Sequence, residues 1–258
     1  MSQAPSPATA FPHSNPYWPG WHTIGLTGLI LFAMGVAAMM GSFLLYLAVD
    51  DGPFDPMLLW QWSFDSRLSA EQQLIIYWSV ATTGFLAVVA CIRRRRSLSV
   101  TDYLALYPVG PRVLAIWLGG TLVFYGLFVF LPTLIATQTG FSMPVPRPSF
   151  LYFVTIVIIA PAIEEVVFRG FMFIGLLHSR TGIAGAIFIT TAIWTAAHYR
   201  IDVDWISDLH ALGIIFSFGI LLCIARIRSN SLLLPLIMHS SWNALVFMVD
   251  ALIIALTR

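Results

Sequence analysis

The segment PAIEEVVFRG, at residues 161–170, places three ionisable side chains inside an otherwise almost wholly apolar run. That run extends from Phe150 to Leu177 and is long enough for a helix to cross a bilayer. A charged residue at the centre of a membrane helix costs about 2.5 to 3.5 kcal/mol, so the three together oppose insertion by roughly 8 to 10 kcal/mol. Because intramembrane ionisable groups are functional by default, we expect this segment to hold the functional centre.

Helix geometry predicts different roles for the three charged residues. Glu165 and Arg169 are four residues apart and share a helix face, so they can form an ion pair. Glu164 is turned about 100° away from Glu165 and must find its partner on another helix. Pro161 and Gly170 flank the charges, where they allow the helix to bend or a neighbour to approach closely. The alternative reading is a buried ion-pair network that only fixes helix packing.

Composition predicts a polytopic protein of the cell membrane. The chain has 258 residues, 59% of them hydrophobic and only 10% charged, and its mean hydropathy is +0.85. These values are far too apolar for a soluble domain, so we expect membrane lipids to surround the protein. The formal net charge of +1 comes with no basic patch of useful size, which argues against nucleic acid as a partner.

Apolar runs divide the chain into about seven expected membrane spans and indicate an all-α fold, a polytopic membrane helix bundle with a polar intramembrane cavity. The expected spans are 24–49, 72–92, 112–136, 150–177, 182–199, 209–225 and 231–256. Residues 1–20 are rich in proline and are expected to form a flexible tail. We divide the remainder into N-terminal transmembrane helices at 21–149 and a core at 150–256, where we expect the functional centre.

Arginine positions predict the orientation, because loops on the cytoplasmic side carry an excess of positive charge. One side of the predicted bundle collects most of the arginines, namely Arg93 to Arg96, Arg112, Arg180, Arg226 and Arg228. The opposite side has fewer arginines and most of the acidic residues. This distribution predicts a cytoplasmic N-terminus and an external C-terminus.

Further polar residues lie on the last helices, where lipid-facing side chains should be apolar. His198 follows Trp194 by four residues, and Asn243 follows His239 by four, so each pair shares a helix face. A rise of about 1.5 Å per residue places these two histidines, Asn243 and Glu164 roughly 12 to 24 Å from the inner ends of their spans. We therefore expect them to converge near the middle of the membrane.

A carboxylate, two imidazoles and a carboxamide in a low-dielectric cavity are suited to hydrolysis by an activated water molecule. They supply a base, a group that orients the water and donors for an oxyanion. Glu164, His198 and His239 could instead hold a zinc ion with an open fourth position. We expect no cofactor, with zinc as the alternative, because the two-histidine helix motif of common zinc proteases is absent.

Three ordered motifs resemble the CPBP family, the intramembrane proteases related to the type II CAAX prenyl endopeptidase and also called Abi proteins. They are Glu164-Glu165-x-x-x-Arg169-Gly170, an aromatic residue four positions before His198, and His239-x-x-x-Asn243 preceded by PLIM at 235–238. The resemblance covers roughly residues 150 to 250. Its one departure is Trp194, where the family usually has Phe, which keeps an aromatic packing residue.

The resemblance implies that Glu164, assisted by His198, activates the water, while His239 and Asn243 stabilise the oxyanion. It implies that Glu165 and Arg169 hold the site together, that the fold is all-helical with a cavity open to the cytosol, and that a glutamate rather than a metal drives hydrolysis.

The resemblance therefore implies an intramembrane endopeptidase, which we expect to act near the C-terminus of a prenylated or membrane-associated peptide or protein. For a bacterial relative, the resemblance suggests bacteriocin maturation or self-immunity. One alternative is a non-catalytic membrane scaffold or bacteriocin-immunity protein that keeps the polar cluster to bind a partner. A proton-coupled transporter is a weaker alternative, because the chain shows no convincing internal repeat.

Overall fold

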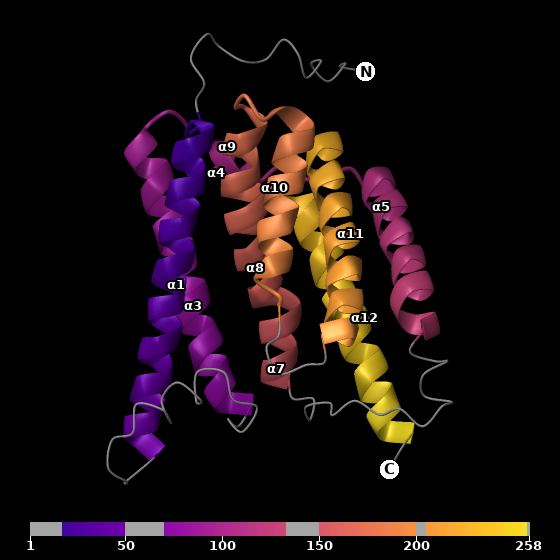
Figure 1. Ribbon diagram of the computed structural model, residues 1–258. Coiled ribbons are helices and arrows are strands. Elements are labelled where there is room, and N and C mark those ends of the chain that lie inside the picture. Colours follow the sequence, from indigo (N-terminus) through magenta and orange to yellow (C-terminus); the bar gives the residue numbers. More distant parts are fainter. Residues whose placement is uncertain (1–16, 50–69, 133–149, 200–204, 257–258) are drawn as a thin grey trace.

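The computed structural model describes residues 17–49, 70–132, 150–199 and 205–256, and every regular element within these residues is a helix. Figure 1 shows the long helices side by side in a bundle, as the sequence predicts. The elements in chain order are α1 (Gly20–Val49), α3 (Ala70–Arg95), α4 (Val100–Leu104), α5 (Pro111–Tyr125), η1 (Gly126–Phe130), α7 (Phe150–Val154), η2 (Thr155–Ile159), α8 (Ala160–Glu165), η3 (Val166–Met172), α9 (Phe173–Leu177), α10 (Gly182–Ala196), α11 (Trp205–Ser229) and α12 (Leu233–Leu256).

Within the described residues, five helical segments are long and apolar enough to cross a membrane, and two shorter apolar helices accompany them. A helix occupies each of the seven predicted spans, but several helices extend beyond the predicted ends. Helix α3 continues through Arg93, Arg94 and Arg95. Arginines favour the C-terminal end of a helix dipole, and their long side chains can reach polar surroundings from an apolar stem. Helix α11 likewise continues to Ser229 rather than ending at residue 225.

The arginines that were predicted to share one side do lie at one end of the bundle. Figure 1 shows that α3 and α11 end there, that α5 begins there and that the turn from α9 to α10 lies there. The short helix α4, which hydropathy did not predict, covers this end; Ser99 caps it by accepting a hydrogen bond from the backbone N–H of Asp102 at 3.1 Å. Tyr103 and Leu104 of α4 are buried. A cytoplasmic location for this end stays a prediction.

The segment from α7 to α9 forms the centre of the bundle, and every residue of η3 is buried. Close approach of its neighbours requires Gly170, because a Cβ atom there would lie 2.8 Å from Leu104 Cδ2 and 3.0 Å from Leu232 Cδ2. By contrast, Thr121 and Tyr125 are the only buried residues of α5. The charged motif therefore lies in the most enclosed described part of the fold.

Candidate active site

Glu165 and Arg169 form the ion pair that their spacing predicts, and His239 completes a buried cluster with them. Arg169 Nη1 donates to Glu165 Oε1 at 2.8 Å, and His239 Nδ1 donates to the same oxygen at 2.9 Å. The side chains of Glu165 and Arg169 are 0% exposed, and that of His239 is 5% exposed. Glu165, Arg169 and His239, here called the sealed cluster, thus share one carboxylate oxygen in the interior.

Arg169 also connects the sealed cluster to two other helices. Its Nη2 atom lies 3.4 Å from the carbonyl oxygen of Gly219 on α11, and its guanidinium carbon lies 4.2 Å from the centre of the Trp194 ring on α10. Glu165 Oε2 and Arg169 Nε are buried and have no hydrogen-bond partner within the described residues. The planar guanidinium can stack on an aromatic face and donate in its own plane at the same time, which suits this position.

Glu164 lies in a second, more open group, here called the open cluster, with Trp194 and His198. Trp194 Nε1 donates a hydrogen bond to Glu164 Oε2 at 2.7 Å, and His198 Nε2 lies 3.7 Å from the same oxygen. The side chain of His198 is 32% exposed and that of Glu164 is 26% exposed. Glu164 therefore finds its partners on another helix, as its rotation away from Glu165 predicts.

The protonation of His198 follows from its backbone contact. His198 Nδ1 lies 2.8 Å from the carbonyl oxygen of Trp194. Because a carbonyl oxygen only accepts hydrogen bonds, Nδ1 must carry the hydrogen, and Nε2 of the neutral ring then presents a lone pair. That lone pair faces the carboxylate of Glu164 at a distance too long for a direct hydrogen bond. When the His198 ring is neutral, the open cluster thus brings two hydrogen-bond acceptors to face each other.

Asn243 is positioned through the irregular helix that precedes Glu164. In η2 the backbone N–H of Ala160 donates to Thr155 O, five residues back. Continuing this pattern would direct residue 161 to Ile156 O, but Pro161 has no N–H. Asn243 Nδ2 donates to Ile156 O instead, at 2.9 Å. The proline therefore leaves a carbonyl oxygen free, and α12 satisfies it with the carboxamide of the third motif.

The predicted site residues are thus divided between two adjoining clusters rather than gathered in one. Trp194 lies between them, with ring centroids 4.8 Å from His198 and 5.5 Å from His239. His239 contacts Glu165 rather than Glu164 through Nδ1. In the part of the chain that the structure describes, no three His, Cys, Asp or Glu side chains are grouped so that they could hold a metal ion.

Sequence reasoning missed the hydrogen-bonding role of Trp194, which it treated as an aromatic packing residue. The signal was the presence of Trp instead of Phe at this position, because the indole ring of Trp carries an N–H donor and the ring of Phe carries none. It also missed the connection of Pro161 with Asn243. Each is a contact between helices that are distant in sequence.

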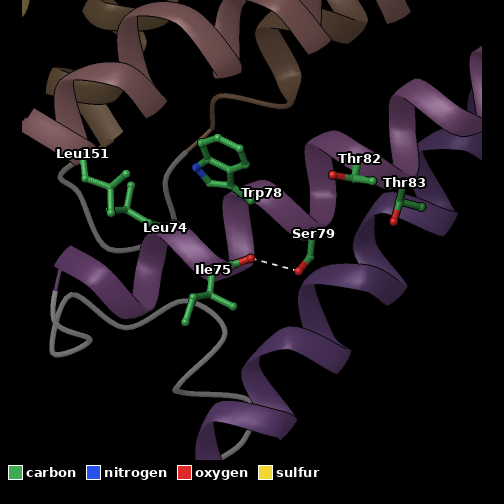
Figure 2. A pocket seen from close by; sticks show the side chains of 7 residues that line it. All are labelled: Leu74, Ile75, Trp78, Ser79, Thr82, Thr83 and Leu151. Carbon is green, nitrogen blue, oxygen red and sulfur yellow. Dashed lines mark hydrogen bonds between the residues drawn. The ribbon is translucent and has the colours of Figure 1, made fainter.

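A cavity of about 650 Å³ lies beside α3, where residues between Leu74 and Thr83 line it together with Leu151 of α7 (Figure 2). Two of its polar side chains are already bonded: Ser79 donates to the carbonyl of Ile75, and Trp78 donates to Thr155 Oγ1. No member of the two clusters lines this cavity. It is therefore a neighbouring apolar space rather than part of the charged site.

The fold and these clusters define a multi-pass helical membrane protein with a buried glutamate and histidine centre. Residues 146–245 match the family described as type II CAAX prenyl endopeptidase Rce1-like, which confirms for this region the resemblance seen in the motifs. An uncharacterized 24.3 kDa protein of Escherichia coli is 29% identical over 199 residues, which cover 70% of this chain and 87% of that protein. No solved structure gives a significant match. The family match supports an intramembrane protease of the CAAX type in general.

Proposed function

We propose that this protein is an intramembrane endopeptidase in which Glu164 and His198 activate a water molecule for attack on a peptide bond. The observation that carries the proposal is that Glu164 Oε2 and His198 Nε2, which is an acceptor in the neutral ring, face each other 3.7 Å apart. A water molecule beside them can donate one hydrogen to each. Such a molecule is both bound and made more nucleophilic, as general-base catalysis requires.

In the proposed reaction Glu164 accepts a proton from the water while the water oxygen bonds to the peptide carbonyl carbon. The carbonyl π bond opens and its oxygen becomes an oxyanion. Glu164 then returns the proton to the amide nitrogen as the C–N bond breaks, leaving a new carboxyl group and a new amine. One carboxylate serves first as base and then as acid.

His239 and Asn243 are the proposed oxyanion donors. Nδ1–H of His239 already bonds Glu165, so donation through Nε2 requires both ring nitrogens to be protonated. Asn243 Nδ2 has two hydrogens, one of which bonds Ile156 O, and the other remains to donate. In this proposal Glu165 and Arg169 hold His239 in place, and the developing negative charge offsets the positive charge of the imidazolium.

The proposed substrate is a prenylated or membrane-associated peptide or protein cleaved near its C-terminus. Support comes from the matched family, whose description names a prenyl endopeptidase, and from the location of the clusters between apolar helices. The same two lone pairs of the open cluster are also suitable ligands for zinc. The experiment below therefore includes a test for metal dependence.

The test is cleavage of fluorogenic peptides by the purified full chain in lipid nanodiscs, using prenylated peptides and a library of unmodified membrane peptides. Glu164→Gln is compared with Asp102→Asn, the same carboxylate-to-amide change at an exposed residue of α4. We expect Glu164→Gln to lower kcat by at least about 100-fold, and Asp102→Asn to have little effect. Wild-type activity should survive a strong chelator.

Loss of wild-type activity with the chelator, restored by zinc, would replace the water mechanism with a metal mechanism. Equal activity of Glu164→Gln and wild type would contradict the role of Glu164 in either mechanism. Absence of cleavage across the whole library would favour the scaffold or immunity alternative, provided that the protein is folded.

A further inference from the structure

Trp194 contacts every other member of both clusters except Glu165. Its side chain donates to Glu164 Oε2 at 2.7 Å, stacks with Arg169 and lies edge-on to His198 and His239. Its backbone carbonyl accepts the hydrogen bond from His198 Nδ1 at 2.8 Å. One residue therefore holds both halves of the acceptor pair, the carboxylate through its side chain and the imidazole through its main chain.

We propose that Trp194 is a positioning residue whose indole N–H holds the Glu164 carboxylate in its productive orientation toward His198. This inference rests on the proposed function, because it assigns the way in which the water-binding pair is held. Trp194 acts through Glu164 and contacts neither the water nor the peptide. Its contribution therefore depends on one hydrogen atom rather than on aromatic bulk.

The carboxylate needs such an anchor because nothing else described fixes it. Glu164 is partly exposed, and among the residues that the structure describes, only Trp194 gives it a direct hydrogen bond. A glutamate side chain rotates about several bonds, so an unanchored carboxylate would spend part of its time away from His198. A hydrogen bond to an ionised acceptor is about twice as strong as a neutral one, which makes this contact an effective restraint.

The indole is itself held rigidly, so its N–H is aimed before substrate arrives. Trp194 is 2% exposed and lies under the guanidinium of Arg169. On α11, Gly219 leaves room for the indole ring, because a Cβ atom at position 219 would lie 2.9 Å from Trp194 Cε3 and 3.0 Å from Trp194 Cζ3. Preorganised contacts of this kind maintain the alignment on which rate depends.

A kinetic comparison separates the N–H group from aromatic packing. Trp194→Phe removes the donor and keeps an aromatic ring; Trp242→Phe makes the same change on α12, where Trp242 stacks on Phe218 at 4.5 Å and is not part of either cluster. We expect Trp194→Phe to lower kcat by about 10- to 100-fold and to leave KM within about threefold, because the N–H does not touch the peptide. Trp242→Phe should change neither constant beyond about threefold.

A spectroscopic measurement tests the hydrogen bond without relying on activity. The full chain is labelled with 15N-tryptophan in nanodiscs, and the indole N–H signal of Trp194 is identified by its loss in Trp194→Phe. Removal of the acceptor in Glu164→Ala should move this signal upfield, and Trp242→Phe should leave it in place. This readout remains decisive if no peptide is cleaved and the proposed function fails.

The inference is overturned if the indole signal of Trp194 does not shift in Glu164→Ala. It is also overturned if Trp194→Phe keeps kcat within threefold of wild type, or if Trp242→Phe lowers kcat as much as Trp194→Phe does. If Trp194→Phe does not fold, β-(3-benzothienyl)alanine at position 194 replaces it, because sulfur substitutes for the N–H with little change of shape. The same 10- to 100-fold fall in kcat is expected of that variant, and retention of wild-type kcat overturns the inference.

Discussion

The sealed cluster and the open cluster place two adjacent glutamates in opposite surroundings. Glu165 is 0% exposed and accepts hydrogen bonds from Arg169 and His239, which are themselves buried. Glu164 is 26% exposed, accepts one hydrogen bond from Trp194 and faces the lone pair of His198. A rotation of about 100° between neighbouring helical residues produces the difference. A carboxylate enclosed by donors, such as Glu165, is suited to stabilising the fold, whereas a partly exposed one that faces another polar group, such as Glu164, is accessible to water and substrate.

The strongest test of the comparison is Arg169→Met, which removes the cation of the sealed cluster. We expect it to destabilise the fold by about 3 to 5 kcal/mol, because Glu165 would remain buried with its main counter-charge lost. Thermal unfolding in detergent measures the effect, and the matched control is Arg228→Met at an exposed residue of α11. Equal loss of stability in both variants would show that the sealed cluster has no special structural role.

A second test acts where the two clusters meet, at the glycine that accommodates Trp194. The Cβ atom of Gly219→Ala would lie 2.9 Å from the ring, so we expect a loss of about 1 to 3 kcal/mol together with reduced peptide cleavage. Gly213→Ala is the control on the same helix, because its added Cβ would have nothing within 4 Å. The control should be neutral or more stable by up to about 1 kcal/mol. If Gly219→Ala matches it in stability and activity, the packing of Trp194 does not couple the clusters.

A third test measures how much the hydrogen bond from Asn243 to Ile156 O stabilises the fold, and whether this contribution depends on Pro161. Asn243→Leu should cost about 1 to 2 kcal/mol, since Ile156 O then has no donor. In the background of Pro161→Ala the backbone N–H returns, so the same change should cost almost nothing. Unfolding of wild type, both single variants and the double variant gives the coupling energy. If Asn243→Leu lowers the free energy of unfolding equally in the wild type and in Pro161→Ala, then Asn243 does not replace the missing backbone N–H of residue 161.

The smallest expected effect concerns the pH dependence of stability. It involves His178, which lies outside both clusters. Burial, together with the charge of Arg226, lowers the pKa of His178 from its ordinary value of 6.5, and its ring stacks on Tyr17 with centroids 4.8 Å apart. Because the folded state disfavours the protonated ring, stability is present above pH 6.5 and declines as the pH falls through the folded pKa.

The measurement is the melting temperature between pH 7.5 and pH 5. We expect acidification to lower it by less than about 3 °C through His178, and His178→Phe to flatten this part of the profile while keeping the stacked ring. A profile that is unchanged in His178→Phe would assign the pH dependence to other groups, among them the two histidines of the clusters.

Much of the helical framework was predictable because it depends on local chemistry. Long apolar runs must satisfy their backbone hydrogen bonds internally in a membrane, so they form helices. The pairing of Glu165 with Arg169 follows from a spacing of four residues on one helix. The short helix α4 escaped prediction, since its five residues depend on a cap at Ser99 and on burial of Tyr103 and Leu104.

The amino-acid order alone predicts which ionisable residues lie inside apolar spans and that Glu165 and Arg169 share one face of a helix, because both properties can be read along a single helix. The catalytic roles of these residues stay predictions. Only the tertiary structure decided that His239 bonds Glu165 and that Trp194 bonds Glu164, across 74 and 30 residues respectively. It also decided that the carbonyl left free by Pro161 is satisfied by Asn243. These contacts depend on the rotation and separation of packed helices, which side-chain periodicity along one helix does not specify.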